Sequence, residues 1–249
     1  MLKYLQVVKV VAAPTYGDLQ ALNFFILEVN YMIRVAILVD GAFYRKRAKM
    51  LQGVKTPIER AKELETYCFK HLEDDKFETY LNRVFYYDCY PSRKNVYHPL
   101  THKSNNLEET DDYKWAYEFF NELKKKRKFA LRMGKLAEEQ AYYNLKPEVT
   151  KKLFNNKISL KDIKVEDFKL SIPQKGVDMR IGIDIAHLSF CKQVDKIILI
   201  SGDSDFVAAS KQARREGIDF VLDPMWMQIK NDLFEHIDGL KSCFPNPNV

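Results

Sequence analysis

The sequence lacks the features that mark several common classes of protein. Its four cysteines, Cys68, Cys89, Cys191 and Cys243, are widely separated and form no CxxC pair, which argues against a structural zinc site and against a disulfide framework. No run of about 18 uncharged apolar residues occurs, so we expect no membrane span. A reduced cytoplasmic protein is the simplest interpretation of these absences.

Motifs for nucleotide binding and for nucleophilic catalysis are also missing. The sequence contains no P-loop, no GxGxxG and no Ser-His-Asp arrangement, and its five histidines are dispersed. The excess of positive charge is small, with 40 Lys+Arg against 34 Asp+Glu. Such a balance permits a polyanionic partner but does not require one.

The first residues differ from the rest of the chain. Residues 1–31 have a weak signal-peptide-like pattern, but Lys9 interrupts its apolar stretch and no small-residue cleavage site follows. Met32 stands immediately before the first strong strand. We therefore expect residues 1–31 to be an appendage, or translation from an upstream start, and residues 32–249 to form one domain with an insertion around 134–172.

Alternation of apolar β-branched runs with amphipathic stretches predicts an α/β fold. Strands are expected at 33–39, 82–87, 129–133, 197–200 and 218–222, and helices at 57–72, 111–128, 177–191, 206–216 and 231–240. The stretch 89–109 lacks periodicity and is expected to be a loop. Right-handed strand–helix–strand connections would place a mainly parallel sheet of about five strands between two helical layers.

Acidic residues stand where two of these strands end. Asp40 ends the first strand, and Asp203 and Asp205 follow the strand at 197–200. Asp178 lies in the first turn of the helix that leads into that strand. Because ligands bind beyond the carboxyl ends of parallel strands, these side chains are expected to converge on one crevice. Taken singly, each is equally typical of a turn or a helix cap.

Several carboxylates in one crevice predict a bound cation. Like charges that close together cannot all remain ionised unless a positive group lies between them. A hard ion with oxygen ligands, Mg²⁺ or Mn²⁺, is the expected partner. Divalent ions of this kind acidify water and stabilise the charge that develops on a phosphodiester during hydrolysis.

Three strings in the chain resemble the signature of a known family. These are VDG at 39–41, KGVD at 175–178 and SGDSDF at 201–206. They resemble the NYN domain family, which belongs to the PIN-like metal-dependent nucleases, and the chain is most similar to the bacterial LabA-like branch over roughly residues 33–225. The resemblance implies a PIN-like three-layer α/β/α sandwich that binds Mg²⁺ or Mn²⁺ and cuts RNA. By position, the catalytic metal ligands would be Asp40, Asp178, Asp203 and Asp205.

Three further residues are candidates for supporting roles around the pocket. Asp184 lies on the same expected helix as Asp178, but six residues correspond to a rotation of roughly 240°, which makes joint ligation poor. Ser201 and Ser204 could hydrogen-bond a carboxylate or a phosphate, and they are equally typical of loop and helix-capping groups.

Basic and aromatic residues near the expected pocket are candidates for binding RNA, which we expect to be single-stranded. Many relatives carry Asn shortly after the first Asp-Gly, whereas this chain has Ala-Phe-Tyr there. The candidates that follow the first and second strands are Tyr44, Arg45, Arg47, Arg93, Lys94 and Lys103. The basic run at 124–128 is expected at the opposite edge of the sheet.

Other functions remain open from the sequence. A non-catalytic regulator could keep the fold and bind RNA or protein, and the chain could form a homo-oligomer. A haloacid-dehalogenase-type phosphatase ranks lower because Ala42 stands where its second Asp would be required. A Toprim enzyme ranks lower because it would need Glu in place of Asp40.

Overall fold

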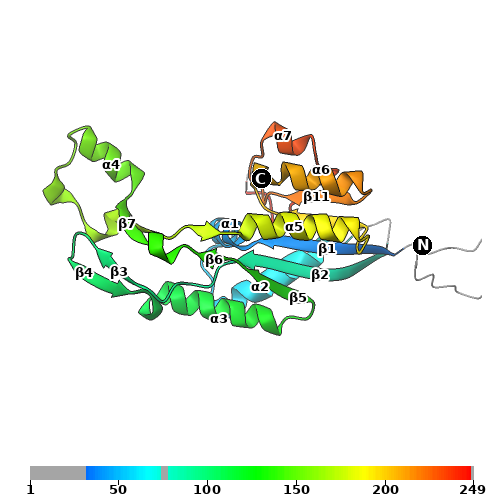
Figure 1. Cartoon of the computed structure of the whole chain (residues 1–249), viewed down its shortest axis with the longest axis horizontal. Helices are drawn as coiled ribbons and strands as arrows, with labels where there is room; N and C mark the ends of the chain where they lie inside the picture. Colours follow the sequence, from blue (N-terminus) through cyan, green and yellow to red (C-terminus); the bar gives the residue numbers. More distant parts are fainter. Residues whose placement is uncertain (1–31, 74–77, 248–249) are drawn as a thin grey trace, which may run out of the picture.

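A six-stranded parallel sheet between two layers of helices forms the body of the protein (Figure 1). The structure is a computed structural model that describes residues 32–73 and 78–247, so the expectation for residues 1–31 lies outside it. The strand order is β12-β11-β10-β1-β2-β5. The predicted three-layer α/β/α sandwich of the PIN-like type is confirmed, with one more strand in the sheet than the sequence indicated.

The elements of the body follow the expected alternation. The strands are β1 (Ile33–Asp40), β2 (Thr79–Asp88), β5 (Phe129–Met133), β10 (Lys196–Ile200), β11 (Asp219–Asp223) and β12 (Gly239–Leu240). The helices are α1 (Gly41–Gln52), α2 (Pro57–Lys70), α3 (Asp111–Lys125), α5 (Val177–Phe190), α6 (Val207–Arg215) and α7 (Asn231–Phe234). None of the helices in the described part of the chain is long and apolar enough to cross a membrane.

The central strand β1 is apolar throughout because both of its faces are covered. Val35, Ile37 and Val39 pack in a core with side chains of α1, α2 and α3. Ala36 and Leu38 point to the opposite face and pack with side chains of α5 and α6. This alternation assigns the two helical layers to opposite faces of one sheet (Figure 1).

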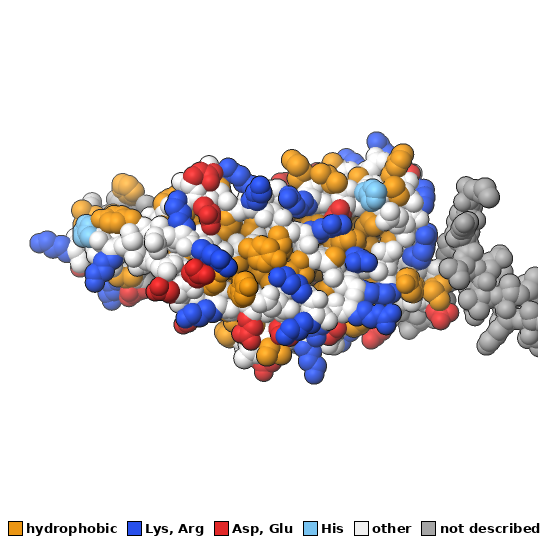
Figure 2. Space-filling model, turned by 60° about the horizontal axis from the view of Figure 1, so that its bottom comes forward, with side chains coloured by type: hydrophobic (Ala, Val, Ile, Leu, Met, Phe, Trp, Pro, Cys, Tyr) orange, Lys and Arg blue, Asp and Glu red, His pale blue; other side chains and the backbone are white. Residues whose placement is uncertain are grey.

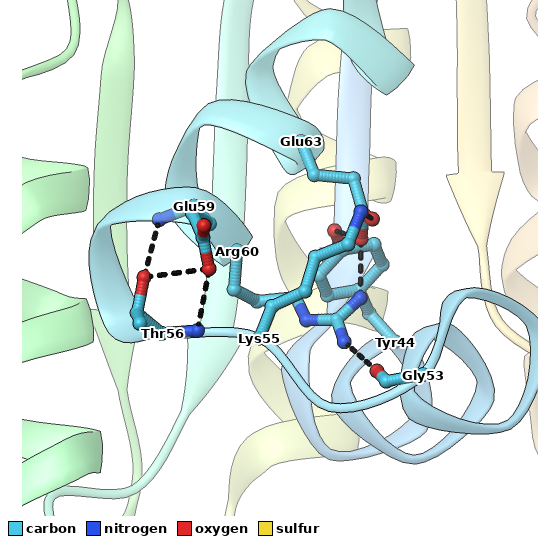
Figure 3. Close-up of polar contacts among 7 residues, drawn as sticks. All are labelled: Tyr44, Gly53, Lys55, Thr56, Glu59, Arg60 and Glu63. Atoms are coloured by element: carbon cyan, nitrogen blue, oxygen red, sulfur yellow. Dashed lines mark hydrogen bonds and ion pairs between the residues drawn. The ribbon is translucent and has the colours of Figure 1, made fainter.

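Helix α2 begins with the capping box that the sequence predicts (Figure 3). Thr56 Oγ1 accepts a hydrogen bond from Glu59 N at 3.3 Å, and Glu59 Oε2 accepts one from Thr56 N at 3.0 Å. Pro57 occupies the first helical position, where its missing N–H costs no hydrogen bond. Two otherwise unsatisfied helix N-terminal donors are paired in this way.

Glu63 joins α2 to α1 and to the segment between them (Figure 3). Its carboxylate accepts a hydrogen bond from Tyr44 Oη at 3.1 Å and forms ion pairs with Lys55 and Arg60. The Arg60 guanidinium also donates to Gly53 O at 2.6 Å. A group of hydrogen-bonded charges therefore fixes the angle between the two helices on this face of the sheet.

Two sequence-based assignments are wrong. The expected loop at 89–109 contains an antiparallel hairpin of β3 (Asn95–His98) and β4 (Lys103–Asn106), whose strands are too short and polar to produce a clear pattern. The expected helix at 231–240 ends at Phe234, and β12 follows it as the sixth strand of the sheet. Asp238 directs the chain into the sheet, since its carboxylate accepts from Phe220 N at 2.9 Å.

The region 134–172 forms short elements beyond the carboxyl ends of the central strands. β6 (Lys135–Leu136) pairs with β9 (Gln174–Lys175) at its base, and β7 (Tyr142–Leu145) pairs with β8 (Phe168–Ser171) further out, with α4 (Pro147–Phe154) between them. The β3–β4 hairpin lies beside β7 (Figure 1). We call the β3–β4 hairpin together with residues 142–171 the arm.

Candidate active site

Asp40 lies at the centre of the carboxyl edge of the sheet. It ends β1 and caps α1, so that its Oδ1 accepts a hydrogen bond from Phe43 N at 3.1 Å. Its Oδ2 accepts from Ser201 Oγ at 3.3 Å. Burial raises the pKa of Asp40 to about 6, and the charges of Asp178 and Asp88 act in the same direction, while the two hydrogen bonds oppose the shift.

Side chains of the SGDSDF segment form hydrogen bonds with the backbone of the same segment. Ser201 is fully buried, and its Oγ accepts a hydrogen bond from Asp203 N at 3.3 Å while donating to Asp40. Asp203 Oδ1 in turn accepts from Asp205 N at 3.0 Å and caps a short 3₁₀ turn, Ser204–Phe206. The register of β1 and β10 pairs Val39 with Ile200, so this segment begins beside Asp40.

Asp178 joins this group from the other side of the edge. It lies in the first turn of α5, two residues after Gly176, whose φ of 76° is in the left-handed region that favours glycine. Burial raises the pKa of Asp178, and the charges of Asp203 and Asp205 raise it further. Because Asp178 also acts on Asp40, these carboxylates interact across β1, β10 and α5.

In the described part of the chain these carboxylates lack an ion-pair partner, and Arg45, which interacts with Asp40 electrostatically, is paired with Asp88. Within the described residues, no ion pair includes any of the acids Asp40, Asp178, Asp203 and Asp205. Over the same part of the chain, no three His, Cys, Asp or Glu side chains are gathered closely enough to hold a metal ion as they stand. Asp178, Asp203 and Asp205 are exposed and would have to turn toward Asp40. The donor set suits a hard divalent cation in its chemistry, and its uncompensated charge suits one electrostatically.

Asp88 is an acidic residue at the same edge that the sequence analysis did not include. It ends β2 and is fully buried, and it forms an ion pair with Arg45 at 2.9 Å. Its carboxylate also accepts hydrogen bonds from Cys89 N at 2.8 Å and from Gln174 Nε2 at 3.3 Å. Burial raises its pKa and Arg45 lowers it. Its position at the end of a strand, like that of Asp40, was the signal available in the sequence.

Gly41 allows the start of α1 to pack closely against Asp88 and Tyr86. A Cβ atom on Gly41 would lie 2.6 Å from Asp88 Oδ2 and 2.5 Å from Tyr86 Cζ. Gly41 is the first residue of α1, so the glycine is required there for close packing and not for a turn.

Two of the three candidates for supporting roles, Asp184 and Ser204, are hydrogen-bonded to residues other than the four acids. Asp184 accepts a hydrogen bond from Tyr87 Oη at 2.8 Å and pairs with Arg132 at 3.2 Å, so its charge is compensated. Ser204 accepts from Lys230 Nζ at 3.1 Å. Ser201 alone contacts one of the four carboxylates through its side chain among these candidates.

Several predicted RNA contacts have structural roles instead. Tyr44 is fully buried in the core, so its prediction as a substrate contact is wrong. Arg45 is engaged by Asp88. The guanidinium of Arg47 donates to Met225 O at 2.6 and 3.2 Å and holds the segment after β11.

The RNA-binding candidates that follow the second strand lie at the base of the arm or on it. Arg93 is exposed and donates to Tyr113 Oη at 2.8 Å, and Lys94 donates to Glu138 O at 2.6 Å. Lys103 is exposed on β4. These three residues therefore lie on other elements than Arg45 and Arg47, although all five were predicted around one pocket.

An α/β/α sandwich with acidic residues at the carboxyl ends of its parallel strands is the architecture of the PIN-like nucleases. Comparison with known protein families matches residues 94–226 to the NYN domain, which is more than half of the chain. The chain therefore belongs to the NYN domain family, whose members are generally nucleases. Asp178, Asp203 and Asp205 lie inside the match, and Asp40 precedes it.

Comparisons with individual proteins add little to the family assignment. No curated protein matches the chain. Among solved structures, a protein of unknown function from Vibrio parahaemolyticus is similar, with 13% sequence identity, a TM-score of 0.41, and coverage of 84% of this chain and 91% of that one. A similarity at this level does not bear on function.

Proposed function

We propose that this protein is a divalent-metal-dependent endoribonuclease that hydrolyses phosphodiester bonds of single-stranded RNA. Asp40, Asp178, Asp203 and Asp205 would be its catalytic residues and would hold Mg²⁺ or Mn²⁺. Placement in the LabA-like branch, a single domain from residue 32 onward and a cytoplasmic location belong to the same proposal.

The observation that supports it is the contrast between two kinds of carboxylate at one edge of the sheet. Asp88 is buried and neutralised by Arg45. Asp40 also ends its strand, yet it is in no ion pair of the described residues, and the charges of Asp178 and Asp88 add to the effect of burial in raising its pKa. A protein that needed these acids for packing alone would be expected to pair them as it pairs Asp88.

The chemistry follows from the residue types. When bound, the cation would acidify a water molecule and reduce the charge on the phosphodiester. Ser201 holds Asp40 and the backbone of Asp203 in a defined relative position through its two hydrogen bonds. Asp178 approaches from α5, so that an ion would be held from more than one element.

Cleavage of labelled single-stranded RNA with Mg²⁺ or Mn²⁺, beside single-stranded DNA of the same sequence, tests the proposal. Asp203→Asn keeps the acceptor for Asp205 N and removes the charge, so cleavage should fall to the level of a chelated sample. Asp232→Asn, an exposed acid on α7, is the matched control and should cleave normally. Activity that survives both Asp203→Asn and chelation would exclude this site.

A binding measurement separates metal affinity from activity. Adding Mg²⁺ or Mn²⁺ should raise the melting temperature of the wild type more than that of Asp203→Asn, since a ligand stabilises the folded state it binds. RNA binding without cleavage by the metal-loaded wild type would instead favour the non-catalytic regulator.

A further inference from the structure

The outer part of the arm is rich in lysine. Residues 142–171 contain only four acids, Glu148, Asp162, Glu166 and Asp167, against seven lysines, which are Lys146, Lys151, Lys152, Lys157, Lys161, Lys164 and Lys169. All of these lysines except Lys146 are classed as exposed. Figure 2 shows basic side chains at the outer end of the molecule, next to exposed hydrophobic ones.

Among the described residues these lysines form no ion pair, whereas two of the acids of the arm accept hydrogen bonds from neighbouring residues. Asp162 Oδ2 accepts hydrogen bonds from Ser159 N at 2.8 Å and Ser159 Oγ at 2.7 Å, and Asp167 accepts from Lys164 N at 2.8 Å. In the described structure, no ion pair includes a lysine of residues 142–171, although ion pairs such as Lys126–Glu65 occur on the body. Residues 142–171 therefore have an excess of positive charge, with seven lysines against four acids.

The two halves of the arm are joined through His98. Its ring is buried between Tyr143 and Phe168, with ring centroids 4.6 Å and 4.9 Å away. The hairpins are also linked by Asn105 Nδ2, which donates to Tyr143 Oη at 3.2 Å. The arm is thus a packed unit with its own small core.

The base of the arm is continuous with the acidic site. The arm returns to the body through β9, and Gly176 and Asp178 follow directly. Gln174 in β9 donates to Asp88 Oδ1 at 3.3 Å, so this connection also contacts the edge of the sheet. Figure 1 shows the arm extending beyond the ends of β1 and β2, the edge that carries Asp40.

Exposed aromatic side chains accompany the lysines. Tyr97, Tyr142 and Phe154 are 54%, 52% and 80% exposed. Aromatic faces stack on unpaired bases, and lysines bind the phosphates between them. Duplex RNA presents few unstacked bases, so this combination fits a single strand.

We propose that the arm is a binding surface for single-stranded RNA, separate from the acidic site and leading to it. This inference rests on the proposed function for the identity of the polyanion. The lysines of residues 151–169 bind the phosphate backbone, and Tyr142 and Phe154 stack on bases. The arm holds a strand whose adjacent segment reaches Asp40 and Asp178.

Binding of a 5′-fluorescein-labelled 20-nucleotide RNA of mixed sequence, measured by anisotropy in EDTA, tests the inference without any cleavage. The triple variant Lys151→Gln, Lys157→Gln, Lys161→Gln should bind about tenfold more weakly, with a shallower dependence of affinity on salt. The matched control, Lys62→Gln, Lys114→Gln, Lys211→Gln, removes the same charge from exposed positions on the body. It should bind within about twofold of the wild type, because long-range effects of surface charge are screened by salt.

Phe154→Ala provides a second measurement that leaves the charge unchanged. It should weaken RNA binding about fivefold or more, and its exposed position means that melting temperature should stay at the wild-type value. Equal affinity of the arm triple and the body triple, or no RNA binding by the wild type in EDTA, would overturn the inference.

The outcomes for the arm and for the acidic site are distinguishable. A wild type that binds through the arm but does not cleave would leave the arm standing and remove the nuclease proposal. If the wild type cleaves the 20-mer and the arm triple binds and cleaves it equally well, the nuclease proposal stands and the proposal for the arm fails.

Discussion

Arg45 Nη2 lies 2.9 Å from Asp88 Oδ2, and this ion pair distinguishes Asp88 from the other acids at the same edge of the sheet. Asp88 is fully buried and paired with Arg45, whereas Asp40 and the acids near it are in no ion pair of the described residues. Arg45, which was predicted to contact RNA, therefore has a structural role: it balances the charge of the buried carboxylate of Asp88.

Replacing Arg45 with Met should destabilise the protein by about 3–5 kcal/mol, because it leaves the carboxylate of Asp88 buried without a counter-charge. The double variant Arg45→Met, Asp88→Asn should recover a large part of that loss. Urea unfolding at pH 7 measures both. A single variant as stable as the wild type would contradict the ion pair.

Gly41→Ala should destabilise the protein by about 1–3 kcal/mol, because the added methyl group would overlap Tyr86 and Asp88, which are both buried. Gly182→Ala in α5 is the matched control, since a Cβ atom there meets nothing within 4 Å. The control should gain up to about 1 kcal/mol from helix propensity. Thermal unfolding of the two variants compares them, and equal stability would argue against close packing at Gly41.

The pKa of Asp40, raised from 3.8 to about 6, predicts a pH dependence of stability in metal-free buffer. The folded state holds the proton more tightly than the unfolded chain, so this contribution is fully present below pH 3.8 and is lost as pH rises through about 6. Up to about 3 kcal/mol is involved. Asp40→Asn can still cap α1 and should be more stable than the wild type at pH 7.

The control for this experiment is Glu118→Gln, which removes an exposed carboxylate on α3. Free energies of unfolding measured from pH 4 to pH 7 in EDTA should change less steeply for Asp40→Asn than for the wild type and for the control. Identical slopes for all three proteins would show that Asp40 titrates normally.

Asp223 connects the end of β11 to α2 and to the C-terminal segment. Its buried carboxylate accepts hydrogen bonds from His71 Nε2 at 2.8 Å, Met225 N at 2.7 Å, Ser242 Oγ at 2.7 Å and the Tyr67 hydroxyl. Asp223→Ala should cost about 3 kcal/mol or more, because it leaves several buried donors unpaired. Ser242→Ala removes one of them and should cost about 1 kcal/mol. Comparable losses in denaturant unfolding would contradict this network.

Local signals in the sequence were sufficient for much of the body. The continuous apolar runs of β1 and β10 indicated strands covered on both faces. Thr56, Pro57 and Glu59 indicated the start of α2, because a capping box involves only neighbours in the chain. The SGDSDF string indicated the loop of Asp203 and Asp205 for the same reason.

Signals that depend on distant residues were missed or misjudged. Tyr44 follows Asp40 closely in the chain, but a helix begins between them and directs its ring into the core. In the sequence, Asp88 could not be distinguished from any other acid at the end of a strand, because its ion pair with Arg45 forms only in the folded protein. The β3–β4 hairpin is stabilised by packing of His98 against Tyr143 and Phe168, which are far away in the sequence.

The sequence by itself determined five of the six strands of the parallel sheet and that acids stand where strands end, because apolar periodicity and strand-end chemistry are local properties. Only the tertiary structure decided which of these acids is neutralised and which remain without a counter-charge. It also decided that the lysines of residues 142–171 lie on an arm beyond the edge of the sheet. Burial and pairing of charges depend on residues far apart in the chain, and the fold alone brings those residues together.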